Sequence, residues 1–122
     1  MLSGCGAQPA DRVDEVTLAS GVTCTVEWRL KPQSGAGTAT KVASDALAGA
    51  TITEEEIRMW EAQLREEYVA EFGEPDAEKE AEFERLAPVE VVREQVREAL
   101  AAAGFPDSPS RLVEVEGSAD CD

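Results

Sequence analysis

The residues of this 122-residue chain best suited to covalent chemistry are three cysteines, Cys5, Cys24 and Cys121. None belongs to a Cys-x-x-Cys pair, which argues against a zinc site or a thioredoxin-type redox centre. The chain has no histidine, so it lacks the commonest metal ligand and the commonest general base. Neither a Ser-His nor a Cys-His nucleophile can form.

Carboxylates are the other abundant reactive groups, with 26 acidic against 11 basic residues. Many lie in residues 54–98, where a solvated helix surface explains them without a site. The chain has no EF-hand spacing, no phosphate-binding GxxxxGK[ST] or GxGxxG loop and no G-x-S-x-G nucleophile elbow. We therefore expect no catalytic residues, no metal ligands and no cofactor, and we expect that the protein is not an enzyme.

The charge balance narrows the choice of partners. A net charge of −15 repels nucleic-acid phosphates, so we expect no nucleic-acid binding. It favours a protein partner with a basic surface, or it serves only solubility. The length suits one domain with a single modest core.

Residues 13–30 have the pattern of a β-hairpin. Apolar and polar residues alternate from Val22 to Leu30, and Val16 and Leu18 alternate in the same way upstream. This period of two, rich in β-branched residues, predicts two strands. Residues 19–21 are the expected turn, because Gly21 can adopt a positive φ angle.

Three helices are predicted in the middle of the chain. Residues 53–73 begin with a capping box at Thr53 and end at Gly73, with an apolar face between them. Residues 76–87 predict a short polar helix, and Pro88 fits the first turn of a third helix that ends at Gly104.

The segment before these helices, residues 32–51, is rich in Ala, Gly, Ser and Thr. It is read as a long loop that contains either a third strand near residues 38–42 or a short helix near residues 44–47. Its role is left open between a tolerated insertion and a mobile, partner-facing segment.

A final strand of about five residues is predicted in residues 111–116, followed by a tail. Strands at both ends with helices between them indicate the α+β class. We expect the N-terminal hairpin and the C-terminal strand to form a small antiparallel sheet. Two or three helices cover one face of it, chiefly residues 53–73 and 88–104.

The start of the chain, Leu2-Ser3-Gly4-Cys5, resembles the lipobox of bacterial lipoproteins, which reads Leu, a small residue, Gly or Ala, then Cys. The resemblance covers these four residues and no domain family. It implies a diacylglyceryl thioether on Cys5, which cleavage would leave as the mature N-terminus. Only Met1 and Leu2 precede Ser3, so the basic and apolar parts of an export signal are expected upstream. Residues 1–12 are then a lipobox remnant with a flexible tether, and residues 13–122 are one α+β domain.

If Cys5 carries the lipid, two cysteines remain. Cys24 lies in the second predicted strand and Cys121 a few residues beyond the last one, so neighbouring strands would let them form a disulfide. The alternative is that Cys24 is a small buried apolar residue and Cys121 a free thiol in the tail.

The sequence thus predicts a small acidic lipoprotein of the bacterial cell envelope, anchored to the membrane through Cys5. Its domain lies on the extracytoplasmic face and has a non-catalytic binding or interaction role. The alternative is a cytosolic or phage-encoded acidic protein that binds a basic partner. An enzyme that uses carboxylates ranks third.

Overall fold

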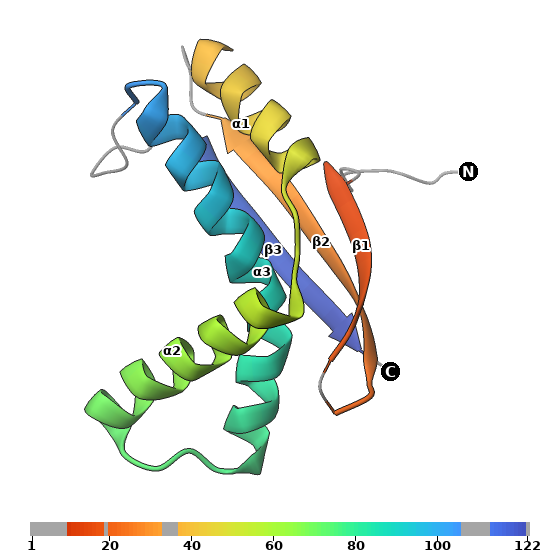
Figure 1. Cartoon of the computed structure of the whole chain (residues 1–122), viewed down its shortest axis with the longest axis vertical. Coiled ribbons are helices and arrows are strands. Elements are labelled where there is room, and N and C mark those ends of the chain that lie inside the picture. Colours follow the sequence, from red (N-terminus) through yellow and green to blue (C-terminus); the bar gives the residue numbers. More distant parts are fainter. Residues whose placement is uncertain (1–9, 19, 33–36, 106–112, 122) are drawn as a thin grey trace.

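The computed structural model describes residues 10–18, 20–32, 37–105 and 113–121. The elements follow the order β-β-α-α-α-β, which confirms the α+β class (Figure 1). The three strands form one antiparallel sheet in the order β1-β2-β3, so the N-terminal hairpin pairs with the C-terminal strand as predicted. The bounds are β1 Arg12–Thr17, β2 Thr23–Pro32, α1 Gly37–Gly49, α2 Glu54–Phe72, α3 Ala77–Ala102 and β3 Val113–Cys121.

The hairpin β1-β2 forms where the alternating pattern predicts it. The amide of Leu18 donates to the carbonyl of Val22 at 2.8 Å, and Gly21 adopts a φ of 92°. Ala19, the first residue of the predicted turn, lies outside the described residues. The inward side chains of β2 are fully buried, as the alternation requires: Cys24, Val26 and Trp28.

The segment predicted as a loop contains a helix, α1, of 13 residues. The strand prediction near residues 38–42 is therefore wrong, and the short helix predicted near residues 44–47 is longer than expected. Ala39, Ala43 and Leu47 lie four residues apart and are all buried. Two of these are alanines, whose small side chains let the helix lie close to the sheet.

Helix α2 has the predicted ends but not the predicted place. The Thr53 hydroxyl accepts a hydrogen bond from the Glu56 amide at 3.2 Å, and Gly73 ends the helix with a φ of 87°. The prediction that α2 covers the sheet is wrong, because it packs against the first half of α3 instead. Both segments extend away from the sheet (Figure 1). Of the predicted apolar face only Ile57 is buried, and Phe72 is 67% exposed.

The two helices predicted on either side of Pro88 are one continuous helix, α3, of 26 residues. Proline removes one backbone hydrogen bond and costs about 3 kcal/mol in a helix interior. Here the proline ring is itself buried, and a run of core residues continues through it. Burial of this continuous face offsets the lost bond. The buried residues of α3 are Phe83, Ala87, Pro88, Val89, Val91, Val92 and Val96.

Strand β3 is nine residues long, not about five, because the predicted tail pairs with β2 as far as Cys121. Helices α1 and α3 cover one face of the sheet (Figure 1). The core lies between that face and the two helices. The other face carries the charged side chains of β2 and β3.

Candidate functional site

Two of the three predicted site residues come together. Cys24 on β2 lies directly opposite Cys121 on β3, with 4.1 Å between their Cα atoms, and the two form a disulfide bond. They are 97 residues apart in the sequence. Cys121 belongs to the strand and not to a tail beyond it, which corrects the prediction of its surroundings. Disulfides are typical of oxidising compartments outside the cytosol, and this bond indicates such an environment.

The third predicted residue, Cys5, lies outside the described residues, so lipid attachment there stays a prediction. The same holds for the boundary between tether and domain at residues 12 and 13. In the structure β1 begins at Arg12. None of the helices in the described part of the chain is long and apolar enough to cross a membrane.

Arg12 makes a structural network that sequence reasoning missed. Its guanidinium donates to the carbonyls of Leu47 and Ala50, both at 2.7 Å, at the C-terminal end of α1. It also pairs with Asp14 at 2.7 Å and lies 5.6 Å from the centre of the Trp28 ring. A cation at this helix end is favoured by the helix dipole. Arg12 therefore fixes α1 on the sheet.

The acidic helices do not provide a convincing acid–base pair. Burial raises the pKa of Glu61, and the negative charge of Glu84 raises it further. Glu61 and Glu54 line a pocket of about 280 Å³, but Arg58 lines it too and lowers the pKa of Glu61. Within the described residues no three Asp, Glu, Cys or His side chains are arranged to hold a metal ion.

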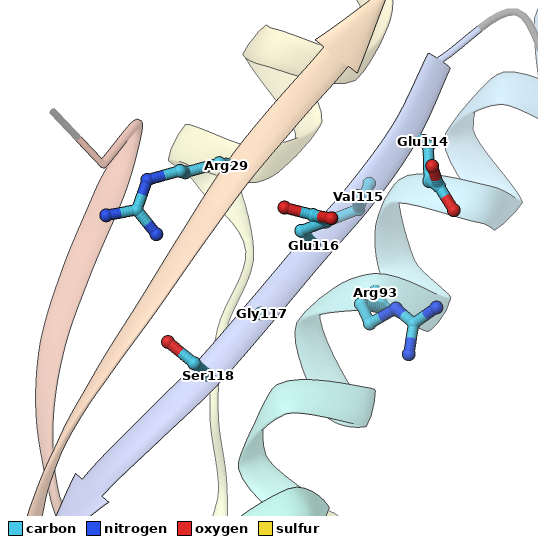
Figure 2. Close-up of a pocket in the computed structure, with 7 residues that line it drawn as sticks. All are labelled: Arg29, Arg93, Glu114, Val115, Glu116, Gly117 and Ser118. Carbon is cyan, nitrogen blue, oxygen red and sulfur yellow. The ribbon is translucent and has the colours of Figure 1, made fainter. Parts of the chain in front are cut away.

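The best candidate site is the outer edge of β3 beside α3 (Figure 2). Two adjoining grooves of about 410 and 210 Å³ follow this strand. Both are lined by Arg93 of α3 together with Glu114 and Val115 of β3. Figure 2 shows that Arg93 projects from α3 at the side of β3 that faces away from β2. Arg93 is held by Glu90, one helical turn earlier, at 2.6 Å.

This edge has unused backbone groups, because β3 pairs with β2 on one side and no described strand lies on its other side. In an antiparallel pair, residues alternate between those that bond to the partner strand and those whose N–H and C=O point away from it. The Cα distance of 4.1 Å between Cys24 and Cys121 is typical of a pair without mutual hydrogen bonds. In agreement, the Trp28 carbonyl accepts from the Asp11 amide at 2.8 Å, on the side of β1.

By the same alternation, the residues of β3 that bond to β2 are Glu114, Glu116, Ser118 and Asp120. The residues between them present their amides and carbonyls at the open edge, chiefly Val115, Gly117 and Ala119. The side chains of Val115 and Ala119 pack against the core on the face of the strand that α3 covers, and Gly117 lies between them on the same face. The sequence predicted a strand here, but its length and its place at the edge of the sheet could not be read from the pattern alone.

Compared with protein-family models, with curated proteins and with solved structures, the chain matches none.

Proposed function

We propose that this protein is a lipid-anchored binding protein of the bacterial cell envelope, with its α+β domain on the extracytoplasmic face. The observation that carries the proposal is the disulfide between Cys24 and Cys121. It supports export from the cytosol, since the cytosol keeps thiols reduced. It also uses two of the three cysteines and leaves Cys5, the cysteine of the lipobox-like segment, for lipid.

The anchor suits the charge of the domain. A diacylglyceryl group supplies two acyl chains, which is enough for stable membrane attachment. The domain carries most of a net charge of −15, and anionic headgroups repel it. Attachment through lipid and a short tether therefore does not require the domain itself to bind the membrane.

The role of the domain is binding and not catalysis. The chain has no histidine, and the pocket lined by Glu54 and Glu61 also contains Arg58, whose charge lowers the pKa of Glu61. The open edge of β3 offers hydrogen-bonding groups to another chain. A protein partner with a basic surface fits the acidic domain.

The test is the mass of the protein purified from its source organism. We expect the mature chain to start at Cys5, to carry a diacylglyceryl group and to contain one disulfide. A Cys5→Ala variant should leave the membrane fraction, whereas a Cys24→Ala/Cys121→Ala variant should stay in it. An unmodified chain that retains Met1 and has three free thiols would contradict the proposal and favour the cytosolic alternative.

A further inference from the structure

We propose that the outer edge of β3 binds an extended segment of a partner protein as an added antiparallel strand, with basic and apolar residues alternating along that segment. This gives the binding role proposed above a location and a class of partner. It rests on that role and not on the lipid anchor.

The first support is the length and regularity of the open edge. Strand β3 runs for nine residues, and its pairing with β2 continues without an extra residue on either strand. Exposed edges of this kind are usually protected by proline, by charged side chains and above all lysine, by a bulge or by a short strand. The segment Val113–Cys121 contains neither proline nor lysine, and its charged residues are all acidic, so they repel an acidic strand but not a basic one. Its edge therefore remains able to pair with another strand.

The second support is the charge on the outer face of the strand. Glu114, Glu116 and Asp120 are all exposed there. Glu116 has a partner, Lys31, at 2.9 Å. Glu114 and Asp120 make no ion pair among the described residues. An added strand would place its outward side chains beside these carboxylates, where Lys and Arg are favoured and acidic residues are not.

The same charges argue against a second copy of this chain as the occupant. If two β3 strands paired with Gly117 opposite Gly117, Glu114 of each would face Asp120 of the other. If the two strands are shifted by two residues in one direction, Glu116 of one copy lies opposite Glu116 of the other. A shift by two residues in the other direction places Glu116 opposite Asp120. Like charges directly opposite each other are destabilising. Only registers that pair less of the strand avoid such contacts.

The groove between this edge and α3 determines which side chains the inner face of the added strand can carry. Its lining includes three apolar residues, Val96, Leu100 and Val113, of which only Leu100 is partly exposed, together with the charged side chains of Arg93, Arg97 and Glu114. Every second side chain of an added strand would point into this groove. Because two arginines and one glutamate line the groove, a basic side chain is disfavoured there, whereas an uncharged side chain such as valine can contact Leu100. The partner segment should thus be basic on its outer face and apolar on its inner face.

The test uses the full, oxidised chain and a capped heptapeptide of alternating lysine and valine. Peptide binding is followed by amide chemical shifts and by hydrogen exchange. We expect exchange to slow at Val115, Gly117 and Ala119, whose amides would gain a partner. The control peptide has the same composition with its lysines and valines in separate blocks, and it should bind about tenfold more weakly or worse, since it cannot present one basic face.

Two double variants distinguish binding at the β3 edge from nonspecific attraction of a basic peptide to an acidic protein. The double variant Glu114→Lys/Asp120→Lys should bind the alternating peptide about tenfold more weakly, or worse, than wild type does. The control variant Glu66→Lys/Glu71→Lys makes the same change in net charge at exposed positions of α2. Its affinity for the alternating peptide should fall by less than about threefold.

Equal weakening by the two double variants would overturn the proposal. So would equal binding of the two peptides, protection of α2 amides in place of the β3 amides, or a β3-paired dimer of the oxidised chain. The wild-type exchange pattern decides the matter even if a variant fails to fold. An unlipidated Cys5 in the native protein would contradict the anchor but would leave these results unaffected.

Discussion

Trp28 on β2 lies directly opposite Gly117 on β3, and its indole N–H donates to the carbonyl of Val89 on α3 at 3.2 Å. A β-carbon built on Gly117 would lie 3.2 Å from Cδ1 of Trp28 and would overlap the side chain of Val89. Glycine is therefore required at this position by the close approach of α3 to the sheet. The absence of a side chain there lets the fully buried Trp28 ring lie under the helix.

Gly117→Ala is expected to destabilise the fold by about 1–3 kcal/mol, because the added methyl group forces Val89 and the Trp28 ring to move in a close-packed core. Urea unfolding followed by tryptophan fluorescence measures the change. Gly49→Ala is the matched control, since a β-carbon at Gly49 meets nothing within 4 Å. Equal stability of Gly117→Ala and wild type would show that α3 does not pack as closely as described.

Arg12→Ala is expected to lower the free energy of unfolding by about 2 kcal/mol. It removes two hydrogen bonds to the last carbonyls of α1 and a cation over the Trp28 ring. Arg12→Lys keeps the charge but not the forked geometry, so it should recover only part of the loss.

Hydrogen exchange of the α1 amides gives a local readout of the same contact and should speed up in Arg12→Ala. Arg58→Ala, at an exposed position of α2, is the control and should leave exchange in α1 unchanged. A uniform loss of stability without faster local exchange in α1 would argue against the capping role of Arg12.

Reduction of the disulfide between Cys24 and Cys121 is expected to cost about 3–5 kcal/mol, because the bond closes a long loop in the unfolded chain. The Cys24→Ala/Cys121→Ala variant should show a similar loss. Thermal unfolding with and without a reductant measures it, and the double variant should not respond to the reductant. If wild type is equally stable in both conditions, the bond contributes nothing to the fold.

Much of this fold could be predicted from local patterns. The hairpin follows from strict alternation along β2, and the ends of α2 follow from the side chain of Thr53 and the glycine at position 73. These features depend on residues close together in the sequence, which is why they can be read from it. The disulfide was predicted only by assigning Cys5 to lipid, which leaves two cysteines, and by assuming that β2 and β3 are neighbours.

The remaining features depend on contacts between distant segments. Pro88 is a signal for a helix start, but burial of its ring against the core keeps α3 continuous. Residues 117–121 look like a polar tail, yet they become strand because β2 is long enough to pair with them. The capping of α1 by Arg12 spans 35 residues to Leu47, and no local pattern indicates it. The open edge of β3 follows from these same distant contacts.

Glu61→Gln is expected to stabilise the protein at neutral pH. The Oε2 atom of Glu61 is buried without a hydrogen-bond partner, and burial with the charge of Glu84 raises the pKa of this carboxyl. A raised pKa in the folded state means that folding favours the protonated form. The contribution of the Glu61 carboxyl to stability is complete at pH values below its pKa in the unfolded chain. This contribution is lost as the pH rises through the raised pKa of the folded state.

Glutamine is a neutral replacement of the same shape, so the gain at about pH 7 should be at most about 1 kcal/mol, because the residue is only partly buried. The gain should vanish near about pH 3, where the wild-type carboxyl is protonated in both states. Urea unfolding at the two pH values measures this difference. Glu66→Gln, at an exposed position of the same helix, should change the pH dependence much less. An equal effect in the two variants would mean that the benefit comes from lower net charge, and not from the buried oxygen of Glu61.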